Sequence, residues 1–153
     1  MGRAGFWAVS SGEISFRHDG RWYSDGEPIN NSRIALLFSR CLRQIEDGRW
    51  QIAMADERAF VTIEDTPWVV TGVERDAAGG FRLRLNDGSE EPLDPASLAV
   101  GAQNVLYTRV KSGHRARFLR PAYYQLAPAI EERDGHFVLV SGGARTAIAR
   151  DAS

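Results

Sequence analysis

The clearest hydrophobic pattern in the chain lies between residues 32 and 46. Apolar residues recur there at steps of three and four: Ile34, Leu37, Phe38, Cys41, Leu42 and Ile45. This spacing puts them on one face of an α-helix and predicts a helix over residues 32–46. Asn31 or Ser32 is a suitable N-cap, and Gly48 is a suitable end. Cys41 lies within the apolar stripe, which favours a small buried side chain over a reactive thiol.

On both sides of this helix, apolar and polar positions alternate, as they do in half-buried strands. The first third of the chain has such segments at residues 13–17, 21–23, 49–54 and 59–64. Asp19-Gly20 is a turn signal between the first two of them. The first third is therefore predicted to fold as strand–strand–helix–strand–strand.

The last third of the chain shows the same order of elements. Strands are predicted at residues 105–110, 114–118, 136–140 and 145–148. Pro121 suits the first turn of a helix that runs through Ala127. Pro128 follows at once and is expected to kink or shorten that helix.

A constant offset of 87 residues relates the two thirds. The aligned pairs include Gly26 and Gly113, Arg33 and Arg120, Gly48 and Gly135, Trp50 and Phe137, Ile52 and Leu139, and Val61 and Ile148. Self-similarity at a fixed offset indicates an internal repeat. We therefore predict two similar domains, an N-terminal α+β repeat at 13–64 and a C-terminal α+β repeat at 65–149.

The segment between the repeats adds strands to the second half. Strands are predicted at 68–74 and 81–85, with a short strand before Pro92. Pro92, Pro95 and Gly101 punctuate a loop in which little regular structure is expected. The added strands are predicted to extend the second half into a larger curved sheet with a helix against it. Long βαβ crossovers are absent, which excludes a doubly wound fold and favours α+β with mostly antiparallel sheets.

Composition and charge exclude several classes of protein. The chain of 153 residues is 43% hydrophobic and 25% charged, as in ordinary globular domains. Its net charge of −1 gives no strong signal for a nucleic-acid polymer. No window approaches the roughly 18 apolar residues of a spanning helix, and no signal peptide is recognisable, so a cytoplasmic protein without membrane insertion is expected. The single cysteine allows no intrachain disulfide.

The sequence contains no recognisable catalytic or metal-binding motif. His18, His114 and His136 are far apart and have no metal-ligand spacing. Neither a P-loop nor a nucleophile elbow occurs. No cofactor, metal or catalytic residue is therefore predicted.

The segment from Thr62 to Trp68 carries the first set of candidate binding residues. Glu64 and Asp65 offer carboxylates as hydrogen-bond acceptors, and Trp68 offers an aromatic face. They lie where the two halves meet, and such junctions are common places for a ligand cleft. A strand end, a proline turn and a core tryptophan account for the same residues without a ligand.

A local basic run carries the second set. It consists of Arg109, Lys111, Arg115, Arg117 and Arg120. On a strand, Arg109 and Lys111 would share one face, and Tyr123 follows close by in the chain. Such a face suits an anionic, aromatic ligand such as a nucleotide. A solvated sheet face is the alternative interpretation.

Several segments taken together resemble the bacterial domain-of-unknown-function family twelve-eighty-five. They are residues 19–23, 26–29, 37–38 and 63–68, Ala116 with Arg120, residues 123–124 and residues 141–143. The match runs from about residue 13 to residue 149, and the Glu-Asp-x-Pro-aromatic segment is its most specific part. Lys111 departs from the expected Arg, and Trp68 from the commoner Phe.

The resemblance implies a duplicated α+β core whose C-terminal half is loosely like a pleckstrin homology domain. It also implies a groove between the halves for a nucleotide-like ligand, in a signalling role. No enzymatic activity or catalytic residue is implied by the resemblance, so none is carried over to this chain.

The sequence thus favours a non-enzymatic module that binds a small, nucleotide-like ligand at an interdomain cleft. The predicted ligand-binding residues are Glu64, Asp65, Trp68, Arg109, Lys111, Arg120 and Tyr123. Two alternatives stay open: an enzyme that acts on a small phosphorylated or nucleotide substrate in the same cleft, and a protein-interaction adaptor with exposed aromatic residues. The oligomeric state is left open.

Overall fold

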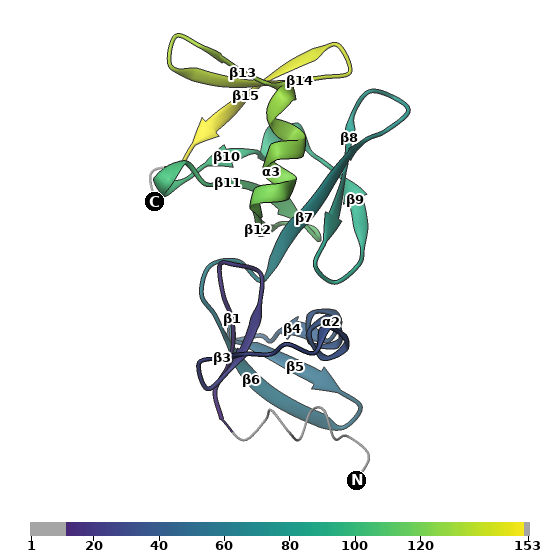
Figure 1. Cartoon of the computed structure of the whole chain (residues 1–153), viewed down its shortest axis with the longest axis vertical. Helices are drawn as coiled ribbons and strands as arrows, with labels where there is room; N and C mark the ends of the chain where they lie inside the picture. Colours follow the sequence, from purple (N-terminus) through teal and green to yellow (C-terminus); the bar gives the residue numbers. More distant parts are fainter. Residues whose placement is uncertain (1–11, 152–153) are drawn as a thin grey trace. The chain divides into compact units, whose positions relative to one another are not determined.

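The computed structural model describes residues 12–151, and the chain divides into two compact units, 1–67 and 68–153 (Figure 1). The division falls between Pro67 and Trp68, two residues after Asp65. Each unit has its own sheet and its own helix. The fold class is α+β, with mixed sheets that account for most of the regular structure.

The first unit is built on a six-stranded sheet. Its elements are β1 (Ile14–Phe16), β2 (Trp22–Ser24), β3 (Glu27–Pro28), α2 (Ser32–Arg40), β4 (Leu42–Gln44), β5 (Trp50–Met54) and β6 (Glu57–Ile63). The strand order is β3-β2-β1-β6-β5-β4. β1 runs parallel to β6, whereas the other pairs in this sheet are antiparallel. The predicted strands of the first third are confirmed, and β3 and β4 were not foreseen.

Helix α2 is shorter than its hydrophobic pattern predicts. The Asn31 side chain caps it by accepting hydrogen bonds from the next turn, as expected. The helix ends at Arg40 rather than at residue 46, because Leu42 is drawn into the sheet opposite Ile52 in β5. Gly48, with φ 92°, lies in the β4–β5 turn and does not end the helix. Cys41 is the C-cap and is half-buried, whereas a buried side chain was expected.

Three aromatic side chains form the centre of the first unit. The Phe16 and Trp22 ring centroids are 4.9 Å apart, and those of Trp22 and Phe38 are 5.6 Å apart. The buried Trp22 indole N–H donates a hydrogen bond to Ser39 Oγ at 2.9 Å. This bond ties the helix to the sheet and satisfies a polar atom that would otherwise be costly to bury.

The second unit is built on a nine-stranded sheet. Its strands are β7 (Trp68–Arg75), β8 (Phe81–Leu85), β9 (Glu90–Pro92), β10 (Ala99–Val100), β11 (Leu106–Val110), β12 (His114–Phe118), β13 (Ile130–Arg133), β14 (His136–Ser141) and β15 (Ala144–Arg150). The order is β13-β14-β15-β10-β11-β12-β7-β8-β9. Two pairs are parallel, β7 with β12 and β10 with β15. The strands predicted from alternation are all present.

The segment from Pro92 to Gly101 is more regular than expected. Asp94 caps the short 3₁₀ turn η1 (Pro95–Ser97) by accepting a hydrogen bond from the Ala96 N–H at 3.1 Å. β10 follows and bridges β11 and β15. Two residues are too few to show an alternating pattern, which is why the sequence predicted a loop here. A second 3₁₀ turn, η2 (Ala102–Asn104), leads into β11.

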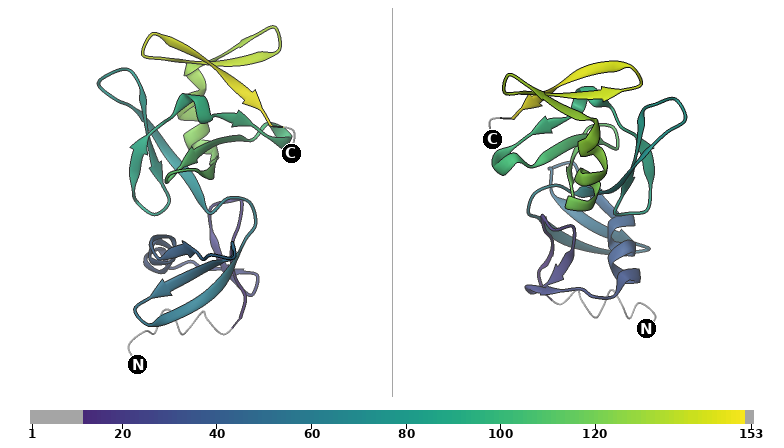
Figure 2. Two further views of the ribbon diagram at one scale, coloured as in Figure 1. Left: turned by 180° about the vertical axis from the view of Figure 1, so that it is seen from behind. Right: turned by 45° about the horizontal axis from the view of Figure 1, so that its top comes forward.

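Helix α3 (Arg120–Leu126) packs beside β7 in the second unit (Figures 1 and 2). Pro121 lies in its first turn, and Ala122 and Leu126 are completely buried. Pro128 lies in the 3₁₀ turn η3 (Ala127–Ala129), which continues the helix and leads into β13. Pro128 therefore shortens the helix as predicted.

Candidate functional site

The predicted site residues divide between the two units. Glu64 and Asp65 belong to the first, whereas Trp68, Arg109, Lys111, Arg120 and Tyr123 belong to the second. The interdomain cleft that would bring the two sets together therefore stays a prediction.

Glu64 is paired with a histidine of its own unit. The His18 backbone N–H donates to Glu64 Oε1 at 2.7 Å, and His18 Nδ1 lies 2.7 Å from the same oxygen. These two hydrogen bonds, with the backbone bond the larger cause, lower the pKa of Glu64 below its ordinary value. Both side chains are about half exposed. The half-buried Asp65 follows directly.

Trp68 and Lys111 are in contact. The Lys111 Nζ lies 5.2 Å from the centroid of the Trp68 ring, a cation–π distance. The same ammonium is 2.8 Å from Asp87 Oδ2 and 3.3 Å from Ser89 Oγ. The His114 ring lies 5.4 Å from the Trp68 ring, centroid to centroid. The indole is therefore already lined by side chains of its own unit.

The Lys111 ion pair is partly buried. Its side chain is 27% exposed and that of Asp87 is 9% exposed. Burial alone would raise the pKa of Asp87, but hydrogen bonds from Lys111 and Ser89 outweigh it and lower this pKa below its ordinary value. The Lys111 charge is therefore matched by a carboxylate within the unit, which leaves less of it for an anionic ligand.

The expected strand face of Arg109 and Lys111 is not formed. β11 ends at Val110, and Lys111 lies in the following turn with φ 49°. Arg109 donates a hydrogen bond to the Gly113 carbonyl oxygen at 2.8 Å. The alternating pattern misled here because it cannot show where a strand ends. Arg120 is exposed at the start of α3.

Tyr123 lines a mostly apolar pocket in the second unit. This pocket has a cavity volume of about 170 Å³. Its lining is Val100, Asn104, Leu106, Tyr123, Ile130, Phe137 and Ile148. These residues come from β10, η2, β11, α3, β13, β14 and β15. Apart from Tyr123, none of these residues was predicted to belong to a site, since each has a residue type that is common in strands or loops.

The pocket has the chemistry of a small-molecule site, although its cavity volume is smaller than that of most such sites. Ligand pockets typically enclose about 300–1,000 Å³ and have mostly apolar linings with a few polar groups. Here the polar residues of the lining are Tyr123 and Asn104. Asn104 and the preceding Gln103 both have left-handed backbone conformations, with φ 61° and 60°. Two successive non-glycine residues in this region are uncommon and are held there by the surrounding structure.

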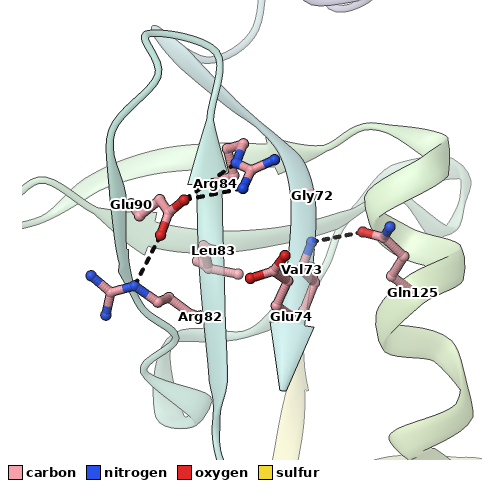
Figure 3. A pocket seen from close by; sticks show the side chains of 8 residues that line it. All are labelled: Gly72, Val73, Glu74, Arg82, Leu83, Arg84, Glu90 and Gln125. Carbon is pink, nitrogen blue, oxygen red and sulfur yellow. Dashed lines mark hydrogen bonds and ion pairs between the residues drawn. The ribbon is translucent and has the colours of Figure 1, made fainter. Parts of the chain in front are cut away.

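A second pocket lies between α3 and the β7–β8–β9 strands (Figure 3). It is smaller, with a cavity volume of about 50 Å³, and its lining is Gly72, Val73, Glu74, Arg82, Leu83, Arg84, Glu90 and Gln125. Glu90 accepts hydrogen bonds from Arg84 and Arg82, each with a contact of 3.1 Å, which lower the pKa of Glu90. The Val73 N–H donates to Gln125 Oε1 at 2.7 Å. The side chains of Arg82, Arg84, Glu90 and Gln125 are therefore already hydrogen-bonded within the second unit.

No three His, Cys, Asp or Glu side chains within residues 12–151 are placed to hold a metal ion. None of the helices in this range has the length and apolar character needed to cross a membrane.

The class that the fold defines is an α+β protein with two sheet-and-helix units. The chain resembles solved structures of DUF1285 family proteins, which confirms the resemblance seen in the sequence. One is from Silicibacter pomeroyi DSS-3, with a TM-score of 0.68 and 24% identity over 91% of this chain and 81% of that one. Another is from Shewanella baltica OS155, with a TM-score of 0.60 and 19% identity over 78% of this chain and 93% of that one.

The other two comparisons found nothing. No family model matches the sequence, and no curated protein matches it. At these identities the likeness to the two structures concerns the fold, and it brings no ligand, reaction or partner with it.

Proposed function

We propose that the protein is a non-enzymatic module that binds a small ligand in the pocket beside Tyr123. The observation that carries this proposal is the pocket itself, a cavity of about 170 Å³ lined mainly by apolar residues, with Tyr123 and Asn104 as its polar members. Pockets of this kind bury most of a small ligand, and the few polar groups orient it. Tyr123, one of the residues predicted from the sequence, lines this pocket.

Binding of a nucleotide-like ligand at an interdomain cleft remains a prediction that is more specific than the binding of some small ligand. Trp68 and Lys111 lie within cation–π distance, which supports a role for them as a pair. However, Asp87 neutralises Lys111, and His114 lies against the indole. A nucleotide would have to compete with these contacts. The apolar pocket is therefore the better supported site, and a role in signalling stays a prediction.

The enzyme alternative has one specific observation in its favour. His18 and Glu64 form an exposed pair at 2.7 Å, and a carboxylate that orients a histidine is a common element of general acid–base catalysis. Substitution of His18 by Gln tests the alternative, since a hydrolase using this pair would lose turnover while ligand binding in the second unit persisted.

We also propose that the two units arose by duplication. The offset of 87 residues relates β6 to β15, and it relates the cross-strand pair Trp50–Val61 to the pair Phe137–Ile148. The sheet order β3-β2-β1-β6-β5-β4 recurs as β12-β11-β10-β15-β14-β13. These correspondences support domains near the predicted 13–64 and 65–149. β7, β8 and β9 extend the second sheet, which is in keeping with the predicted pleckstrin homology-like half.

Two adjacent tyrosines provide the test of the binding proposal. Tyr123 lines the pocket and is 39% exposed, whereas Tyr124 does not line it and is 62% exposed. A library of small aromatic and aliphatic compounds, with nucleotides included, is screened against ¹⁵N-labelled protein by NMR. Binders should perturb the amide signals of Val100, Asn104 and Phe137.

The affinities of the variants then decide the proposal. For these binders, Tyr123→Ala should weaken binding about tenfold, which is the loss expected for one well-packed aromatic contact. Tyr124→Ala should leave the affinity unchanged. Equal effects of the two substitutions, or no perturbation around the pocket by any compound, would overturn the proposal. Thermal unfolding of both variants checks that each is folded.

A further inference from the structure

Arg150 extends from the strand face that lines the apolar pocket. Side chains alternate between the two faces of a strand, so residues two apart share a face. Ile148 on β15 lines the pocket. Arg150, two residues further on, therefore shares that face, whereas Arg145 on the same strand points to the opposite one.

Two further contacts place Arg150 at the rim of the pocket. It lies opposite Val100 in the parallel pair of β10 and β15. Its guanidinium carbon is 5.9 Å from the centroid of the Phe137 ring. Val100 and Phe137 both line the pocket. The cation is therefore next to the apolar space and not inside it.

The charge of Arg150 is not matched by a carboxylate within residues 12–151. Two nearby arginines are matched in this way: Arg145 is 2.8 Å from Glu131, and Arg115 is 2.9 Å from Asp151. The pocket lining itself contains no Asp, Glu, Lys, Arg or His. An apolar space with one such cation at its rim is complementary to a molecule that has an apolar body and an anionic end.

We infer that the ligand of this pocket is an amphipathic carboxylate, whose apolar body fills the space beside Tyr123 and whose carboxylate is held by Arg150. This inference rests on the proposed binding function. A planar guanidinium matches a carboxylate through two parallel hydrogen bonds. A single arginine suits one negative charge better than the double charge of a phosphate monoester, which favours a carboxylate.

Three probes with one bicyclic body and different charges test the inference. They are 1-naphthoate, 1-naphthalenemethanol and protonated 1-naphthylmethylamine, titrated into the full chain with affinities from NMR. The acid should bind most tightly, and its affinity should fall as ionic strength rises because the Arg150 site is exposed. Arg150→Gln should weaken binding of the acid about threefold to tenfold and leave the alcohol unchanged.

Arg145→Gln is the matched control, since it removes a cation from the same strand on the opposite face. It should leave the affinity for the acid unchanged, and Arg150→Lys should retain part of it. If the three probes bind the pocket equally well, or if Arg150→Gln has no effect on the acid, the carboxylate inference is wrong and the binding proposal survives. If none of the three perturbs the pocket signals, the carboxylate inference is overturned, and the library screen decides the binding proposal separately.

Discussion

The Lys111 ammonium lies 2.8 Å from the Asp87 carboxylate and joins the turn after β11 to the turn after β8. The Lys111 backbone N–H also points to the Glu91 carboxylate, at 3.1 Å from Oε2. The only lysine of the chain is thus held at both its backbone and its side chain. These bonds offset the cost of placing a non-glycine residue in the left-handed region, about 1–2 kcal/mol.

Loss of this ion pair is predicted to destabilise the second unit. Asp87→Asn leaves a half-buried ammonium without its carboxylate, and the expected loss is about 1–3 kcal/mol of unfolding free energy. Denaturant unfolding measures it. Asp47→Asn is the control, because the Asp47–Arg49 pair is exposed and its loss should be undetectable. Equal stability of wild type and Asp87→Asn would show that this pair is not stabilising.

The same carboxylate predicts a pH dependence. The pKa of Asp87 is lower in the folded protein than in the unfolded chain, where it is about 3.9. The contribution of Asp87 to the free energy of unfolding is therefore complete at a pH above the pKa of the unfolded chain. It is lost as the pH falls through the pKa of the folded protein. The stability difference between wild type and Asp87→Asn should shrink steadily in acid below about pH 4. A difference that stayed constant down to pH 2 would contradict the assignment.

Two glycines are predicted to respond in opposite ways to alanine. A Cβ at Gly72 would lie 3.7 Å from Gln125 Oε1, an ordinary contact in the second pocket. Gly72→Ala should therefore be tolerated, with a gain of up to about 1 kcal/mol from the unfolded state. A Cβ at Gly101 would lie 2.8 Å from the Tyr107 ring, so Gly101→Ala should cost about 1–3 kcal/mol.

The Gly101 backbone, with φ −96°, is open to any residue, so the ring contact alone separates the two variants. Melting temperatures of both proteins provide the measurement. A stable Gly101→Ala protein would show that the Tyr107 ring moves aside easily.

The buried bond between Trp22 and Ser39 supports a fourth prediction. Ser39→Ala leaves the indole N–H without its Ser39 acceptor inside the first unit, which should cost about 1–3 kcal/mol. Trp22→Phe removes the donor and also part of the packing. If the hydrogen bond is the cause, the double variant should lose less stability than the sum of the single variants. Strict additivity in denaturant unfolding would refute this account.

Much of the fold follows from local patterns. The strict alternation of Phe81 to Leu85 predicts β8 residue by residue, and the observed burial alternates in the same way. The helix near Leu37 is also predicted, but its end is not. Leu42 continues the helical spacing and fits a strand equally well, and its pairing with Ile52 decides between them. That pairing is a tertiary contact, which the periodicity of one segment does not contain.

The candidate site is less predictable for a related reason. Tyr123 could be chosen from its residue type and position, whereas Val100 and Ile148 become neighbours of one cavity only through the parallel pairing of β10 with β15. β10 has two residues and no sequence signature of its own. The basic run was misleading, because Lys111 lies in a turn and its side chain stabilises that turn. Arg150, the cation at the rim of the pocket, lies outside the run.

The pairing of β10 with β15 has a mechanical consequence. Ala99 and Val100 are the two positions at which β10 meets β15, and this short seam joins the β13–β15 strands to the rest of the sheet. The pocket lining is drawn from both sides of the seam, with Val100 and Leu106 on one side and Phe137 and Ile148 on the other. A molecule bound there would contact both sides of this two-residue pairing, so that occupancy would slow the separation of the β13–β15 strands from the rest of the sheet.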